Sequence, residues 1–215
     1  MHDFAARLFP IPRSLTGDGV RATLLALREL VPLSFHEVPS GTQVFDWTVP
    51  QEWNLRRAVL RGPDGTVVAD SDQRNLQVVG YSTPVRTRLP LAELRPRLHS
   101  LPDRPDWIPY RTSYYRETWG FCLPHRVVEA LPEGDYDVEI DATLESGSLS
   151  YGELFLPGSS DDEVLVSCHV CHPSLANDNL SGIAVSTFLA RELARRERRL
   201  GYRFLWIPGT IGSIT

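Results

Sequence analysis

The sequence is poor in cysteine, with only three among 215 residues, at positions 122, 168 and 171. A small, odd number excludes the dense disulfide framework of small secreted domains. No apolar run approaches the roughly 18 residues of a membrane span, and the first residues lack the basic flank and long apolar stretch of a secretory signal. We therefore expect a cytoplasmic chain without a membrane partner.

An excess of positive charge is also absent. The net charge is −5 at pH 7, so nothing electrostatic points to a nucleic-acid partner. The hydrophobic content of 42% and charged content of 23% are ordinary for a globular protein. The length suits one large domain or two small ones. The sequence leaves the oligomeric state open.

The first 123 residues predict two kinds of structure, a helix followed by a β-rich stretch. Residues 13–31 predict an amphipathic helix in which Ser14 and Thr16 are candidate caps and the apolar residues recur at helical spacing. Residues 35–123 contain short strand-like runs separated by turn residues. We expect this stretch to be a small β-rich domain inserted into an α/β domain made of residues 1–34 and 124–215.

The last third predicts the α/β domain. Residues 136–144 and 148–158 predict two strands, and the polar link between them predicts a hairpin. "EVLVSC", residues 163–168, is nearly all apolar, as expected of a strand buried on both faces. A helical stretch at 181–199 and another apolar run at 202–208 follow. This strand–helix–strand order predicts a parallel pair in an α/β sheet.

Aromatic residues are concentrated between residues 102 and 124. Two interpretations are open: the rings line a ligand cleft, or they pack within a domain junction, which is the interpretation we prefer. The residues are Trp107, Tyr110, Tyr114, Tyr115 and Trp119.

The segment "SCHVCHPSLANDNLSG", residues 167–182, contains the chemically distinctive residues. Cys168–His172 matches a haem attachment pattern, but covalent haem belongs to exported chains. A structural zinc site needs four ligands, and this stretch offers at most three. A redox pair belongs at a helix N-terminus, whereas these cysteines end a predicted strand.

The remaining interpretation depends on position. His172 and Asp178 lie in the loop that leaves a predicted parallel strand, where ligands collect in α/β sheets. An imidazole and a carboxylate suit zinc or a similar divalent ion. The structural alternatives are a helix N-cap for Asp178 and a polar loop residue before Pro173 for His172. The residues alone leave the two interpretations evenly balanced.

"NDNLSGIAV" resembles the signature of the two-zinc α/β aminopeptidases. Three motifs, "PSGTQVFDWTVPQEWN", "IPYRTSYYRETWGFC" and "CHPSLANDNLSG", together resemble the bacterial aminopeptidase-like domain family, and the resemblance covers nearly the whole chain. The resemblance implies a zinc-peptidase-type α/β fold with a partly parallel sheet and an inserted β domain. It also implies that His172 ligates zinc, that Asp178 bridges metals, and that the substrate is a small peptide-like or amide compound.

Two departures from the resemblance matter. A glutamate pair that supplies a general base and a ligand in the peptidases falls here on Gly209 and Thr210, which can do neither. The chain also stops before the remaining ligands, so we expect a C-terminally truncated α/β domain. Two hypotheses follow: a fragment of a metal-dependent aminopeptidase-like hydrolase, inactive by itself, or a non-catalytic ligand-binding or interaction module on a degenerate peptidase fold.

Overall fold

The computed structural model describes residues 1–114 and 116–215. The chain divides into two compact units, one made of Met1–Glu52 and Glu145–Thr215 and the other of Trp53–Leu144. The bounds of the second unit differ from the expected insert, residues 35–123. The first strand after the N-terminal helices pairs with the sheet of the first unit, and the strand at 135–145 belongs to the sheet of the second.

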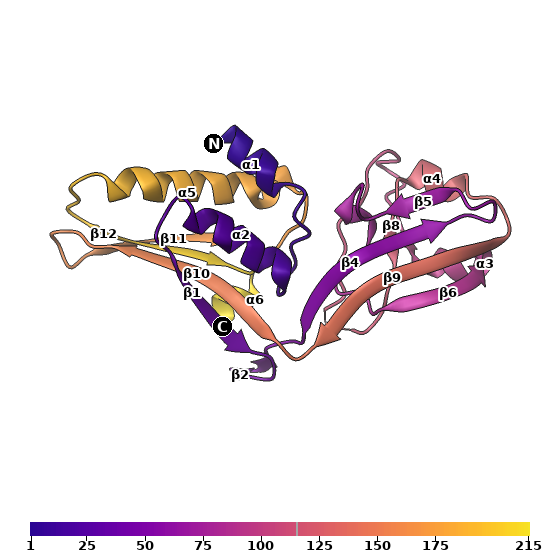
Figure 1. Ribbon diagram of the computed structural model, residues 1–215, viewed down its shortest axis with the longest axis horizontal. Coiled ribbons are helices and arrows are strands. Elements are labelled where there is room, and N and C mark those ends of the chain that lie inside the picture. The colour runs from indigo at the N-terminus through magenta and orange to yellow at the C-terminus, as the bar shows by residue number, and fades with distance from the viewer. Residues whose placement is uncertain (115) are drawn as a thin grey trace. The chain divides into compact units, whose positions relative to one another are not determined.

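The first unit has helices, a four-stranded sheet and a small hairpin (Figure 1). Its helices are α1 (His2–Leu8), α2 (Asp18–Arg28), α5 (Ser181–Ala194) and α6 (Ile211–Ile214). Its sheet strands are β1 (Ser34–Pro39), β10 (Ser148–Leu156), β11 (Glu163–His169) and β12 (Gly201–Ile207), and its hairpin strands are β2 (Gln43–Val44) and β3 (Trp47–Thr48).

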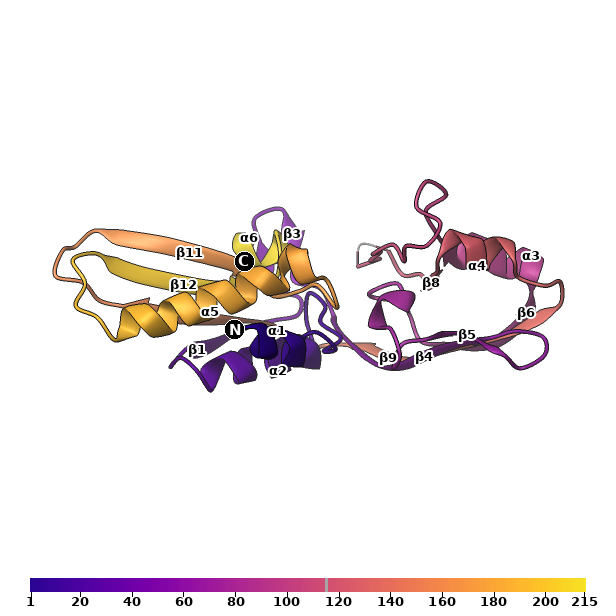
Figure 2. The same cartoon turned by 90° about the horizontal axis from the view of Figure 1, so that it is seen from above.

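The sheet of the first unit has the order β1-β10-β12-β11. β11 and β12 are parallel, as the strand–helix–strand pattern predicts, while β1 and β12 are each antiparallel to β10. Helices α1, α2 and α5 lie over one face of this sheet (Figure 2). Their apolar sides pack on Phe204 and Trp206 of β12, and the buried indole N–H of Trp206 donates to the hydroxyl of Ser186 at 2.9 Å.

Two local predictions for this unit are wrong. β11 is not buried on both faces: Leu165 is 60% exposed, since β11 is the edge strand of the sheet in the described residues and helices cover only its other face. Neither Ser14 nor Thr16 caps a helix. Helix α2 begins at Asp18 after Gly17, whose φ is 92°, and Ser14 and Thr16 are buried in the segment before it.

The second unit is built on a sheet with the order β5-β4-β9-β6. Its sheet strands are β4 (Glu52–Arg61), β5 (Val67–Asp70), β6 (Val85–Pro90) and β9 (Asp135–Glu145). Its other elements are η1 (Asn75–Gln77), α3 (Leu91–Leu94), η2 (Arg95–Arg97), β7 (Leu98–His99), β8 (Phe121–Cys122) and α4 (His125–Glu129). β9 alternates strictly, with Tyr136, Val138 and Ile140 buried and the acidic residues between them exposed.

The predicted hairpin between residues 136–144 and 148–158 does not form. β9 pairs within the sheet of the second unit, whereas β10 pairs with β1 and β12. The link passes Gly147, where an added Cβ would lie 2.4 Å from Oε2 of Glu52, so this position is restricted to glycine. A polar link between two strands is compatible with a hairpin but does not specify which strands pair.

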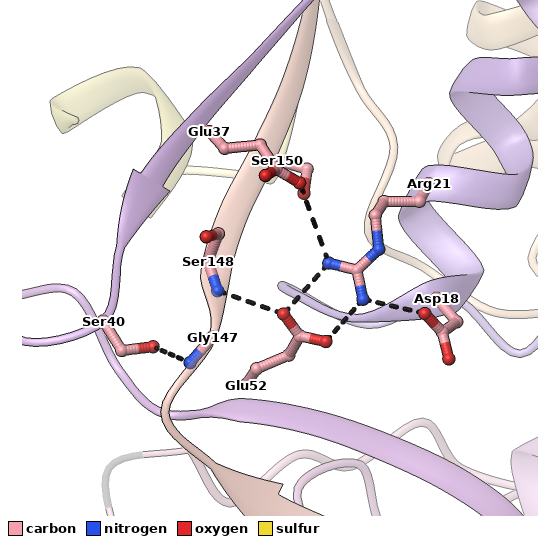
Figure 3. Close-up of polar contacts among 8 residues, drawn as sticks. All are labelled: Asp18, Arg21, Glu37, Ser40, Glu52, Gly147, Ser148 and Ser150. Carbon is pink, nitrogen blue, oxygen red and sulfur yellow. Dashed lines mark hydrogen bonds and ion pairs between the residues drawn. The ribbon is translucent and has the colours of Figure 1, made fainter.

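A polar network in the first unit surrounds Glu52 (Figure 3). Its carboxylate accepts hydrogen bonds from both terminal nitrogens of Arg21, at 2.9 and 2.5 Å, and from the backbone N–H of Ser148 at 3.0 Å. Arg21 also donates to Asp18 at 2.7 Å. Within the first unit, the network therefore ties α2 to Glu52 and to the start of β10.

The aromatic residues of the second unit have different surroundings. Trp107 is 61% exposed beneath the guanidinium of Arg104, and Trp119 lies under Arg97. Tyr114 packs edge-on against Tyr81. Tyr115 lies outside the described residues. In the described parts of the chain, no helix is both long and apolar enough to cross a membrane.

Candidate functional site

The candidate site lies where the parallel strands β11 and β12 end together. His169 is opposite Ile207 in the register, and the N–H of Val170 donates to the carbonyl of Ile207 at 2.9 Å. The chain leaves β11 through residues 170–180 before α5 begins. The sequence predicts this edge, because ligands of α/β sheets collect beyond the carboxyl ends of parallel strands.

The structure brings His172 and Asp178 together. Nδ1 of His172 lies 3.4 Å from Oδ1 of Asp178. The His172 side chain is 22% exposed and that of Asp178 is 67% exposed, so the pair opens to solvent on the carboxylate side. Two ligand atoms that each lie about 2.0–2.1 Å from one zinc in tetrahedral geometry are about 3.3–3.4 Å apart. The spacing is compatible with a shared zinc ion, and it is also the spacing of a direct ion pair between the two side chains.

Asn179 connects the Asp178 segment to the end of β11. With its amide oriented by its neighbours, its N–H donates to the carbonyl of His169 at 2.7 Å and its oxygen accepts from the N–H of His169 at 3.3 Å. The backbone is non-helical at Asp178 and Asn179, and the peptide bond between them is cis. At Gly182 an added Cβ would lie 3.1 Å from the Asn179 amide, so a glycine there leaves room for this contact.

The cysteines do not resemble a redox or haem site. Cys168 and Cys171 are free and are 6% and 2% exposed. Burial raises the pKa of both thiols. Catalytic and redox cysteines need an accessible thiol with a lowered pKa. Cys171 instead accepts a hydrogen bond from the backbone N–H of Gly209 at 3.1 Å.

Gly209 follows β12 and packs directly against the site. An added Cβ would lie 3.1 Å from Nδ1 of His169 and 3.2 Å from Sγ of Cys171. Thr210 has a φ of 51° and is exposed at the start of α6. Since glycine has no side chain and threonine is no general base at neutral pH, neither supplies the acid–base group that the resemblance places here.

The described residues of the chain do not supply a complete set of metal ligands. Over residues 1–114 and 116–215, no group of three or more histidine, cysteine, aspartate or glutamate side chains is arranged to hold a metal ion. A catalytic zinc usually has three protein ligands and an open position. His172 and Asp178 are two groups, one fewer than such a site needs.

A family model described as a domain of unknown function, DUF4910, matches residues 2–215. The chain belongs to this family. A Clostridium acetobutylicum protein named for polysaccharide biosynthesis and an aminopeptidase-like domain is 49% identical over 215 residues, which are 100% of this chain and 50% of that protein.

Solved structures show the fold. A crystal structure described as a peptidase from Clostridium acetobutylicum superposes with a TM-score of 0.97 at 50% identity and covers 100% of this chain and 51% of that one. A zinc aminopeptidase from Bacillus subtilis has a TM-score of 0.56 at 15% identity and covers 98% of this chain and 62% of that one. The expected aminopeptidase-like α/β fold is confirmed. The chain spans about half the length of the relatives it matches first.

Sequence reasoning missed one residue next to the site. Arg13 is 2% exposed, and its Nε donates to the carbonyl of His172 at 2.9 Å. The pattern of residues 13–31 assigned this arginine to an amphipathic helix, whereas it lies in the buried segment before α2. The one signal that could have indicated a packed loop is the run "RSLTGDG", in which small and hydroxylated residues follow this arginine.

Proposed function

We propose that this chain is the part of a zinc-dependent aminopeptidase-like hydrolase that supplies His172 and Asp178 to the metal. The substrate class is a small peptide-like or amide compound. The observation that carries the proposal is the 3.4 Å separation of the two side chains at the carboxyl ends of β11 and β12. The confirmed aminopeptidase-like fold supports it, and solved neighbours of that fold include a zinc aminopeptidase.

Three residues have defined roles in this proposal: His172, Asp178 and Asn179. His172 offers a neutral imidazole nitrogen and Asp178 a carboxylate oxygen, both common zinc donors. Asn179 holds the Asp178 segment against β11 through the backbone of His169. When bound, zinc supplies a Lewis acid that polarises the carbonyl oxygen of the scissile bond.

For the chain by itself we propose weak zinc binding and negligible turnover. It has two of the usual three ligands, and no general base stands at Gly209 or Thr210. We place the remaining ligands in the half of the longer relatives that this chain does not span. The cytoplasmic location and the absence of a nucleic-acid partner stay predictions.

A second candidate function is a binding module without catalysis, which is favoured by the packing around Gly209. A Cβ at this position would lie 3.1 Å from Nδ1 of His169 and 3.2 Å from Sγ of Cys171, so a glutamate there would require these side chains to shift by a few tenths of an ångström. The discriminating observation is whether a glutamate from elsewhere reaches the metal in a full-length relative. If none lies within hydrogen-bonding reach, the binding module is the better description.

Isothermal titration with zinc tests the metal proposal. Wild type should bind weakly, and His172→Ala and Asp178→Ala should each abolish the heat. A Cys168→Ser/Cys171→Ser variant is the control and should bind as wild type does. Equal heats from wild type and both single variants would remove the site, and loss of binding in the cysteine variant would move it to the thiols.

A further inference from the structure

Arg13 is a buried charge without a carboxylate partner in the described part of the chain. It is among the largest fully buried side chains of the protein. Burial lowers its pKa to about 10, which leaves the guanidinium charged at neutral pH. Burying an ion is costly unless hydrogen bonds compensate for the lost hydration. The groups to which the guanidinium donates must therefore compensate for its burial.

The guanidinium joins two separate stretches of backbone. Nε donates to the carbonyl of His172 at 2.9 Å, and Nη1 donates to the carbonyl of Leu8 at 2.7 Å. Nη1 also lies 3.5 Å from the hydroxyl of Thr23 in α2. A planar group with donors in fixed directions can serve such separate acceptors, whereas a lysine ammonium is a single point on a flexible stem.

The segment that presents Arg13 is itself tightly packed. At Gly19, in the first turn of α2, an added Cβ would lie 2.4 Å from the carbonyl oxygen of Pro12. A second link joins the same two regions: the hydroxyl of Ser174, whose φ is 43°, donates to the carbonyl of Phe9 at 3.1 Å. The backbone on both sides of Pro173 is thus held by the α1–α2 region.

We propose that Arg13 is the positioning residue of the His172–Asp178 pair: by binding the His172 carbonyl it orients the loop so that the imidazole meets the carboxylate. This inference rests on the proposed zinc function, and it adds a residue that touches neither metal nor substrate. Removing a group that orients a metal ligand typically costs about 10–100-fold in metal affinity.

The test uses Arg13→Met, Arg13→Lys and, as a control at a less buried arginine, Arg198→Met. Arg198 also donates to three backbone carbonyls in the same unit, those of Pro157, Leu193 and Arg196. Zinc affinity is measured by calorimetry, and backbone amide exchange is followed over residues 170–175 in metal-free protein. Both Arg13 variants should weaken zinc binding by about 10–100-fold and speed exchange in this loop. Arg198→Met should change neither.

The outcomes separate the two proposals. If His172→Ala and Asp178→Ala abolish zinc binding while Arg13→Met binds as wild type does, the positioning role is wrong and the zinc proposal stands. If wild type binds no zinc, the zinc proposal fails, and amide exchange alone tests whether Arg13 holds the loop. Faster exchange confined to residues 170–175 then supports the hold of Arg13 on the loop, and unchanged exchange overturns it. Equal losses in Arg198→Met would show a general loss of stability and also overturn it.

Discussion

The imidazole of His172 faces the carboxylate of Asp178 across 3.4 Å, and the carbonyl of the same histidine accepts a hydrogen bond from Arg13. One side of this residue thus points to the candidate metal position while the other is anchored in the interior. Such a loop can hold two ligands in place before a metal arrives. Preorganisation of this kind is what a functional site needs from its supporting residues.

The network around Glu52 predicts a stability effect (Figure 3). Glu52→Gln should lower the free energy of unfolding by about 1–3 kcal/mol, because charge-assisted hydrogen bonds from Arg21 are lost at a largely buried position. Asp18→Asn removes a partner of the same arginine whose side chain is 81% exposed, and it should cost less than about 1 kcal/mol. Urea denaturation measures both. Equal losses would show that the burial of Glu52 is unimportant.

Asp70 makes the stability of the second unit depend on pH. Arg57 donates to its carboxylate at 2.7 Å, and this hydrogen bond lowers the pKa of Asp70 below its ordinary value. A lowered pKa in the folded state stabilises the protein above the unfolded-state pKa of about 3.9, and that stabilisation disappears as the pH falls through the folded pKa.

Asp70→Asn should therefore cost about 1–3 kcal/mol at neutral pH, and its difference from wild type should shrink below about pH 4. Urea denaturation at a series of pH values measures this difference. Asp64→Asn is a control of the same type at an exposed turn, where the smaller effect of a solvated carboxylate is expected. A difference between wild type and Asp70→Asn that stays constant down to pH 2 would contradict the assignment.

The three thiols should be unreactive in the folded protein. Burial raises the pKa of Cys122 to about 12 and also raises the pKa of Cys168 and Cys171. Because the thiolate is the reactive form, iodoacetamide at pH 8 should label all three slowly in buffer and rapidly in urea. Mass spectrometry counts the labels. Fast labelling of Cys168 and Cys171 in the native protein would revive the interpretation of this pair as a redox device.

Part of the fold follows from the sequence. The parallel pair β11–β12 and the helix between them follow from two apolar runs around a helical pattern, and residues 170–180 follow as a candidate site because ligands collect at that edge. The partners of β9 and β10 could not be read in the same way. Both sequences fit a strand, and the choice of partner is made by sheets assembled from distant segments.

The bounds of the second unit and the role of Arg13 were missed for a related reason. β1 belongs to the first unit because it pairs with β10, a strand more than a hundred positions later in the chain. Arg13 is also defined by a distant partner, the carbonyl of His172. Local periodicity carries no information on such contacts, and a buried arginine is rare enough that a helix surface is the natural expectation.

Crystals grown with zinc test the His172–Asp178 site directly, through anomalous difference density recorded on both sides of the zinc absorption edge. We expect one zinc ion bonded to a ring nitrogen of His172 and a carboxylate oxygen of Asp178, each at about 2.0–2.2 Å. Zinc bound by Cys168 and Cys171, or an ordered zinc elsewhere with neither His172 nor Asp178 as a ligand, would contradict this expectation.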